Sequence, residues 1–129
     1  MKISGIDHIV LTTSNLEACL KFYGEVLGLE VVHQEDRYAL HFGSSKINIH
    51  TRPAEFLPAA QHPQAGALDI CLVVEKPIET VRQELLLKGI SFEQDVVERH
   101  GAMGKMKSLY LRDPDENLVE ICSYTSIEG

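Results

Sequence analysis

Side chains that could hold a metal ion alternate with aliphatic residues in several stretches of the sequence. The stretch "KINIH" (46–50) sets an amide and an imidazole between two isoleucines. Successive side chains of a strand point to opposite faces of a sheet, so this alternation gathers the polar groups on one face. Imidazole, amide and carboxylate groups supply the donors from which proteins build sites for divalent ions. Donors in this setting occupy five positions: His8, Asn48, His50, Asp69 and Glu120.

A sheet with one solvent-exposed face would show the same alternation, so the residue types must decide between the two interpretations. Solvent faces favour Lys, Glu, Thr and Arg, whereas these strands carry ligand types and almost no lysine. Carboxylates brought close together repel one another unless a cation or a shared proton lies between them. We therefore expect a divalent ion bound by His8, Asp69 and Glu120, with Asn48 or His50 as a further donor.

The elements that would position these donors repeat along the chain. "GIDHIVL" (5–11) aligns without a gap on "GALDICL" (66–72), which places His8 on Asp69, and "LGLEVV" (27–32) aligns on "KGISFE" (88–93) at the same offset. Each copy opens with an alternating strand and continues with an apolar spacing typical of a helix. Three more strands follow in each copy. The sequence therefore predicts a βαβββ unit that occurs twice.

Turn and cap signals set the boundaries of these elements. We expect a capping box at Ser14 and Glu17 and left-handed helix ends at Gly28 and Gly89. The turns "GSS" and "DPDEN" would each close a hairpin. The later strands are predicted at about 29–36, 37–43, 46–51, 91–99, 106–112 and 117–124.

The predicted fold class is α+β, with two βαβββ modules that form a curved mixed sheet, or cup, and helices on its outer face. The modules would span about 1–52 and 66–129 of a single domain, joined by a linker at about 53–65 that contains prolines and has no clean period. Curvature of the two copies toward each other would make the polar face concave.

Composition narrows the class of partner and the compartment. The 129 residues are 44% hydrophobic and carry a formal charge of −7, which disfavours nucleic acid or an anionic membrane surface as a partner. The three cysteines lie in apolar runs and are predicted to be reduced and buried. The N-terminus lacks the features of a signal peptide and no apolar run approaches the length of a membrane span, so we expect a cytoplasmic protein.

Two longer stretches, "IDHIVLTTSNLEACLKFYGEVLGLE" and "SLYLRDPDENLVEICSY", give the chain a family resemblance. Together with the doubled βαβββ pattern, they resemble the vicinal oxygen chelate superfamily, which includes glyoxalase I, extradiol dioxygenases, epimerases and bleomycin-binding proteins. "RYALHFGSSKINIH" and "ALDICLVV" look most like the glyoxalase-domain-containing-protein-5-like branch. The resemblance implies a divalent ion, with Zn, Ni, Co, Mn and Fe all open, held by residues of the first and last strands of each module.

Carried over by position, the resemblance assigns metal ligands. His8 matches the first-strand histidine and Glu120 the last-strand glutamate, while Asp69 stands where the metal-dependent enzymes usually carry histidine. Asn48 occupies the position of a glutamate in glyoxalases and of a glutamine in epimerases. Between Asn48 and His50 we expect His50 to be the ligand, because neutral imidazole binds borderline metals more strongly than an amide oxygen does.

The resemblance also implies a reaction class. We expect a metal-dependent lyase or isomerase that transfers a proton on a small oxygenated molecule, with Glu120 as ligand and base. An extradiol-type dioxygenase and a metal-free drug-binding protein are the alternatives. We expect the region 98–105 to be a hairpin loop and the chain to form a homodimer. The expected substrate contacts are Asn48, Arg37, Ser108, Tyr110 and Arg112.

Overall fold

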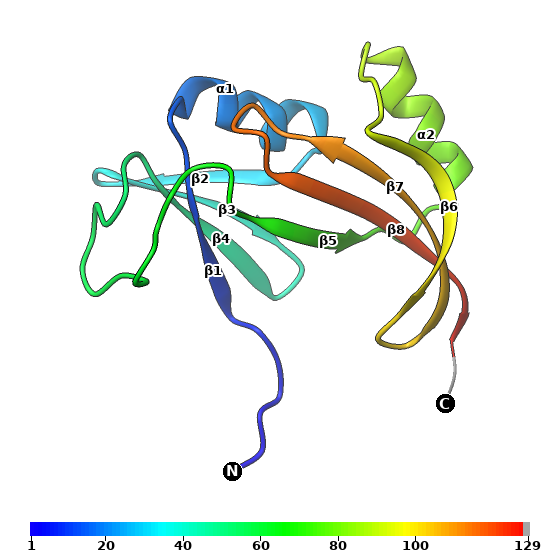
Figure 1. The fold of residues 1–129 in the computed structure, drawn as a ribbon, viewed down its shortest axis with the longest axis horizontal. Coiled ribbons are helices and arrows are strands. Elements are labelled where there is room, and N and C mark those ends of the chain that lie inside the picture. The colour runs from blue at the N-terminus through cyan, green and yellow to red at the C-terminus, as the bar shows by residue number, and fades with distance from the viewer. Residues whose placement is uncertain (128–129) are drawn as a thin grey trace. The chain divides into compact units, whose positions relative to one another are not determined.

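The computed structural model describes residues 1–127 and divides the chain into two compact units, Met1–Leu68 and Asp69–Gly129. Each unit contains one strand, one helical segment and three further strands, as Figure 1 shows along the chain. The first unit comprises β1 (His8–Thr12), α1 (Leu16–Leu20), which continues as the π-helical turn η1 (Lys21–Val26), β2 (Glu30–Gln34), β3 (Arg37–Phe42) and β4 (Ser45–His50). The second comprises β5 (Asp69–Val73), α2 (Ile78–Leu87), β6 (Gln94–Gly101), β7 (Gly104–Arg112) and β8 (Leu118–Ile127).

Each unit builds its own four-stranded mixed sheet. The strand orders are β1-β4-β3-β2 and β5-β8-β7-β6, and the first strand of each unit pairs in parallel with the last. A parallel pair needs a crossover connection, and the helix supplies the start of it, whereas the remaining strands follow as antiparallel hairpins. The predicted fold class, α+β with two βαβββ modules, is confirmed.

The aliphatic residues of the alternating strands form the core on the helix side of each sheet. Apolar burial is the main favourable term in folding, and here it fixes which face of each strand turns inward. In the first unit the buried set is Leu11, Leu40, Ile47 and Ile49 with Cys19, Phe22 and Tyr23 of the helical segment. In the second, α2 packs on β7 and β8, and the buried set is Ile78, Val81, Leu85, Leu109, Leu111, Val119 and Ile121.

The helix boundaries agree with the glycine signals but not with the expected cap. Gly28 and Gly89 have φ values of 78° and 76°, so both helical segments end at the predicted left-handed residue. The expected capping box at Ser14 and Glu17 is wrong. Asn15 is the N-cap, in extended backbone conformation, and its side-chain oxygen accepts a hydrogen bond from the Ala18 N–H at 3.1 Å.

The turn before β8 is built around one buried carboxylate. Asp113 is 3% exposed, and its Oδ1 accepts hydrogen bonds from the backbone N–H groups of Asp115 and Asn117, both at 2.9 Å. Its Oδ2 accepts a third from the Asn117 side-chain amide at 2.8 Å. The turn therefore fixes where β8 begins. No helix within residues 1–127 is long and apolar enough to cross a membrane.

Candidate functional site

The polar groups predicted for the first module do lie on one face of the first sheet. In the pairing of β1 with β4, Lys46 is opposite His8, Asn48 is opposite Val10, and His50 is opposite Thr12. Paired residues of neighbouring strands point to the same face, so His8, Asn48 and His50 share the face that the helical segment does not cover.

His8 is oriented by its neighbour in sequence. Its ring Nδ1 lies 2.8 Å from Asp7 Oδ1, and this hydrogen bond lowers the pKa of the Asp7 carboxyl. A ring held at one nitrogen by a carboxylate presents the other nitrogen, Nε2, to a ligand, which is the common arrangement of metal-binding histidines.

The pairing register separates His8 from His50. The two residues stand four positions apart along neighbouring strands, which corresponds to roughly 13 Å, whereas Asn48 is a diagonal neighbour of His8 at roughly 7–8 Å. Side chains stand roughly perpendicular to a sheet, so an ion about 2 Å from a nitrogen of His8 lies closer to Asn48 than to His50. The register therefore favours Asn48 over His50 as the partner of His8, against the expectation from ligand chemistry.

His50 instead lies at one end of a hollow on this face. His50 is 9% exposed, and its ring packs edge-on against the Phe56 ring with 5.2 Å between the two ring centres. The Cζ of Arg37 lies 3.9 Å from the centre of the Phe56 ring. Burial lowers the pKa of His50 from its ordinary value of 6.5, so the ring is neutral near pH 7. A cation over an aromatic ring contributes about 0.5–1 kcal/mol at an exposed site.

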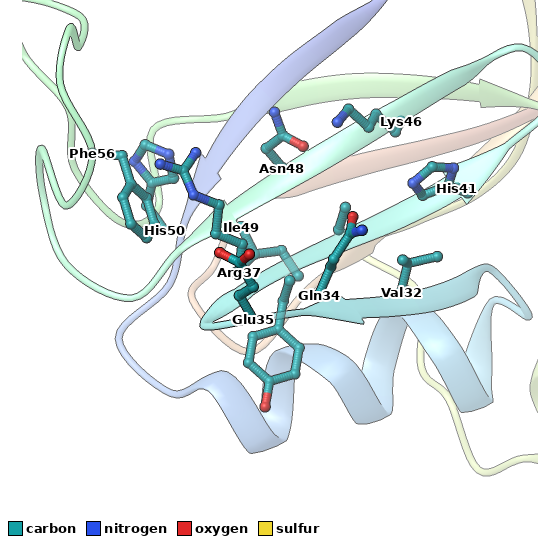
Figure 2. A pocket seen from close by; sticks show the side chains of 12 residues that line it. Val32, Gln34, Glu35, Arg37, His41, Lys46, Asn48, Ile49, His50 and Phe56 are labelled. Atoms are coloured by element: carbon teal, nitrogen blue, oxygen red, sulfur yellow. The ribbon is translucent and has the colours of Figure 1, made fainter.

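The hollow has a volume of about 310 Å³, and we refer to it below as the first-unit hollow. Figure 2 shows Arg37, Phe56 and His50 at one end, Lys46 and His41 toward the other, and Asn48 between them. Two expected substrate contacts, Arg37 and Asn48, thus line one site. The complete lining is Val32, Gln34, Glu35, Arg37, Tyr38, Ala39, His41, Lys46, Asn48, Ile49, His50 and Phe56.

Phe56, Lys46 and His41 are among the lining residues that were not expected from the sequence. Phe56 lies in the segment taken as a linker, and Glu55 holds that segment by accepting hydrogen bonds from the Thr51 N–H at 2.7 Å and the Thr51 hydroxyl at 3.0 Å. Lys46 and His41 pair across β3 and β4 on the face of Asn48. The alternation that located Asn48 also applies to these two residues, whereas no periodic signal marks Phe56.

The second unit gathers acidic and thiol groups on the corresponding face. Glu120 pairs with Cys71 on one side and with Tyr110 on the other, and Asp69, which is exposed, is its diagonal neighbour. Glu120 Oε2 is buried and accepts no hydrogen bond within the described part of the chain. A buried carboxylate oxygen without a donor is costly, so it suits a site in which a bound ion or substrate supplies the missing interaction.

The thiols beside Glu120 are weak nucleophiles. Cys122 is buried, as expected, but Cys71 is exposed, so the prediction of three buried cysteines is wrong for Cys71. Cys71 stands on β5, an edge strand that pairs with β8 on one side only. Burial around its sulfur raises the pKa of Cys71, and burial raises that of Cys122, so both thiols are protonated at neutral pH.

The three residues expected on the seventh strand share the face of Glu120 but differ in their contacts. Ser108 is fully buried, and its Oγ has no hydrogen-bond partner among the residues that are described. The Tyr110 hydroxyl accepts a hydrogen bond from Arg99 Nε at 2.9 Å. Arg112 donates to Glu93 Oε1 at 3.3 Å and to the Glu116 carbonyl at 3.2 Å.

Arg99 belongs to a region whose predicted structure was wrong. The stretch 98–105, expected to be a hairpin loop, is mostly strand, because β6 extends to Gly101 and β7 begins at Gly104. Its two-residue turn is held by a hydrogen bond from the Met103 N–H to the Tyr124 hydroxyl at 3.1 Å.

Each unit carries at least two of the side chains that the sequence offers as metal ligands. The repeat makes His8 and Asn48 of the first unit equivalent to Asp69 and Glu120 of the second. Within residues 1–127 no three His, Cys, Asp or Glu side chains cluster closely enough to hold a metal. The donor types, one imidazole, one amide and two carboxylates, nevertheless fit a divalent ion, and Glu120 Oε2 lacks a partner within its unit.

Comparison with known proteins identifies the family. The model of the Glyoxalase/Bleomycin resistance protein/Dioxygenase superfamily matches residues 5–121. The virulence protein STM3117 of Salmonella typhimurium is 46% identical over 125 residues, which cover 96% of this chain and 87% of that protein. Its crystal structure has a TM-score of 0.93 to this chain, over 97% of this chain and 100% of that one.

Two further relatives extend the comparison. Glyoxalase domain-containing protein RDO1 of Mycosarcoma maydis is 40% identical over 125 residues, which cover 96% of this chain and 70% of that protein. The crystal structure of lactoylglutathione lyase from Agrobacterium tumefaciens shares the fold, with a TM-score of 0.74 at 22% identity over 95% of this chain and 96% of that one. The chain belongs to the glyoxalase/bleomycin resistance protein/dioxygenase superfamily, also called the vicinal oxygen chelate superfamily.

Proposed function

We propose that the protein is a metal-dependent lyase or isomerase of the glyoxalase and epimerase kind, acting on a small oxygenated molecule. The observation that carries the proposal is Glu120 Oε2, a buried carboxylate oxygen with no hydrogen-bond donor in its unit as described. We also propose that the chain belongs to the glyoxalase-domain-containing-protein-5-like branch, and the Mycosarcoma relative is named a glyoxalase domain-containing protein.

The proposed ligands are His8, Asn48, Asp69 and Glu120. His50 is replaced in this set by Asn48 because of the pairing register described above. When bound, a divalent ion would polarise adjacent oxygen atoms of a substrate and make a neighbouring C–H bond easier to deprotonate.

The remaining chemistry belongs to side chains of the protein. Glu120 takes the substrate proton at a carboxylate oxygen, which general base catalysis requires to lie within hydrogen-bond reach. Tyr110 already accepts from Arg99, so its own O–H proton is available to donate to a substrate oxygen. Neutral His50 lines the first-unit hollow beside Asn48 and contacts the substrate instead of the ion.

The proposal extends to assembly and compartment. Each sheet ends in edge strands, β1 and β2 in the first unit and β5 and β6 in the second, and edges of this kind are often covered by a second copy. We propose a homodimer on this ground. Free thiols at Cys19, Cys71 and Cys122 suit a reducing compartment, which supports a cytoplasmic location.

Metal analysis of the purified protein tests the function. We expect one divalent ion per chain, with affinity reduced by about 100-fold or more in Glu120→Gln and Asn48→Ala but unchanged in His50→Ala. Glu98→Gln is the matched control, because it makes the same substitution at an exposed position on β6.

Three outcomes would contradict parts of the proposal. Metal lost from His50→Ala and retained in Asn48→Ala would restore the original ligand assignment. Iron together with oxygen uptake would replace the isomerase with a dioxygenase. Absence of metal under every growth condition would overturn the enzyme and leave a protein that binds a small molecule without an ion.

A further inference from the structure

The guanidinium of Arg37 faces the first-unit hollow. Its Cζ lies 3.9 Å from the centre of the Phe56 ring, and within residues 1–127 it makes no ion pair with a carboxylate. Arginine carries five N–H donors in a planar fork that matches the two oxygens of a carboxylate. We propose that the first-unit hollow binds the carboxylate of a small substrate, with Arg37 as the anchor and the apolar body of the substrate on the sheet.

The charge of the hollow favours an anion although the chain as a whole is acidic. Arg37 and Lys46 contribute two positive charges to the lining and Glu35 one negative charge, and no ion pair joins Glu35 to either cation in the described chain. The lining histidines, His41 and His50, add none when neutral. A net positive hollow in a protein of formal charge −7 attracts small anions to this one place.

Arg37 is positioned before any ligand arrives. The Phe56 ring, on which Arg37 stacks, also packs against the His50 ring, with 5.2 Å between the ring centres. The Glu55 carboxylate holds the segment of Phe56 next to the end of β4 by accepting a hydrogen bond from the Thr51 N–H. A guanidinium already stacked on a ring loses less conformational freedom on binding than a mobile lysine does.

The rest of the lining indicates what accompanies the carboxylate. Ala39 and Val32 pair across β3 and β2 on the face of the hollow and supply an apolar floor beside the Asn48 amide. A volume of about 310 Å³ is at the small end of ligand pockets. The hollow therefore fits a small, partly apolar acid with one oxygen for Asn48.

Lys46 provides a control within the same hollow. It pairs with His41, four residues along β3 from Arg37, which places it roughly 13 Å away along the sheet. A single carboxylate that contacts Arg37 is beyond the reach of direct contact with Lys46. Lys46 thus contributes positive potential, whereas Arg37 contributes hydrogen bonds.

This inference rests on the proposed function, since it names the substrate class of the same site, but its test needs no metal. Protein stripped with a chelator is titrated with benzoate, with benzyl alcohol as a neutral ligand of similar shape, and with inorganic phosphate, while NMR follows the Arg37 side-chain N–H and the His50 ring. We expect benzoate to shift both signals and to bind at least about tenfold more tightly than the other two, because only benzoate offers both a planar anion and an apolar ring.

Variants assign the effect to Arg37. Arg37→Met should weaken benzoate binding by about tenfold or more, whereas Lys46→Met, which also removes one positive charge, should weaken it by no more than about threefold. Glu98→Gln, at an exposed position on β6, should bind benzoate like the unaltered chain.

The outcomes separate this inference from the metal site. Equal binding of benzoate and benzyl alcohol, tighter binding of phosphate, or equal losses in Arg37→Met and Lys46→Met would overturn the carboxylate anchor. Benzoate binding that depends on Arg37 in a chain that never takes up metal would keep this inference and overturn the proposed function.

Discussion

The two units repeat one topology and pair their first and last strands in the same register, yet their polar faces differ in chemistry. At equivalent positions the first unit has His8, Asn48 and His50, and the second has Asp69, Glu120 and Cys122. The first face is hollowed and lined by cationic and aromatic groups. The second carries a carboxylate oxygen, Glu120 Oε2, that is buried and has no hydrogen-bond donor among residues 1–127. The buried residues on the helix side of each sheet maintain the fold, so the residues on the opposite faces can differ without changing it.

The turns of the last hairpin in each unit also differ. The β3–β4 turn has exposed Gly43 and Ser44 at its tip, with Gly43 in the left-handed region at φ 52°, whereas the β7–β8 turn depends on buried Asp113. We expect Asp113→Ala to lower the free energy of unfolding by about 3 kcal/mol, because it removes the acceptor of three hydrogen bonds.

The matched control is Ser44→Ala in the other turn, which should change the free energy of unfolding by no more than about 0.5 kcal/mol. Denaturant unfolding measures both variants. Similar losses in the two variants would show that the turns contribute alike, and this part of the contrast would fail.

A substitution at Asn48 makes the two faces more alike. Asn48→Glu places in the first unit the residue that Glu120 provides in the second, and a carboxylate binds a divalent ion more strongly than an amide oxygen does. We expect metal affinity to rise by about tenfold, or 1.4 kcal/mol, in a competition assay with a chelating dye.

The control for this substitution is Gln34→Glu, which adds the same charge to the lining of the first-unit hollow but on β2. A similar gain in both variants would mean that charge alone attracts the ion and that Asn48 is no ligand.

The smallest expected effect is a pH dependence carried by His50. Because burial lowers its pKa in the folded state, the unfolded chain binds the proton more readily. The stability that neutral His50 contributes is therefore present above pH 6.5 and is lost as pH falls through the lower folded value.

His50→Gln should make unfolding free energy fall less steeply between pH 7 and pH 5 than it does in the unaltered chain. His62→Gln, at an exposed position in the same unit, is the control. An unchanged slope in His50→Gln would show that the ring is accessible to protons in the folded state.

Local periodicity was enough to predict the elements of the fold and the face on which each donor lies. Period-2 alternation located Ile47 and Ile49 in the core, and glycine signals located both helix ends. The cap was misassigned by one residue because Ser14 and Asn15 are both good capping types, and only backbone geometry selects between them.

The candidate site was less predictable because it depends on contacts between distant parts of the chain. Alternation places Asn48 and His50 on one face but does not give their position along the neighbouring strand, and that position decides which of them lies near His8. Phe56 comes from an irregular segment, where no period indicates burial or a partner. The missing donor at Glu120 is a property of the folded surroundings and leaves no trace in residue spacing.

The buried Asp113 turn bears on how chains of this kind are recognised. "DPDEN" closes a hairpin through the three hydrogen bonds that Asp113 accepts within the turn. A related chain could replace every proposed metal ligand and still keep this turn. A search with this turn sequence therefore identifies the fold. The reaction depends on the residues on the sheet faces that point away from the helices.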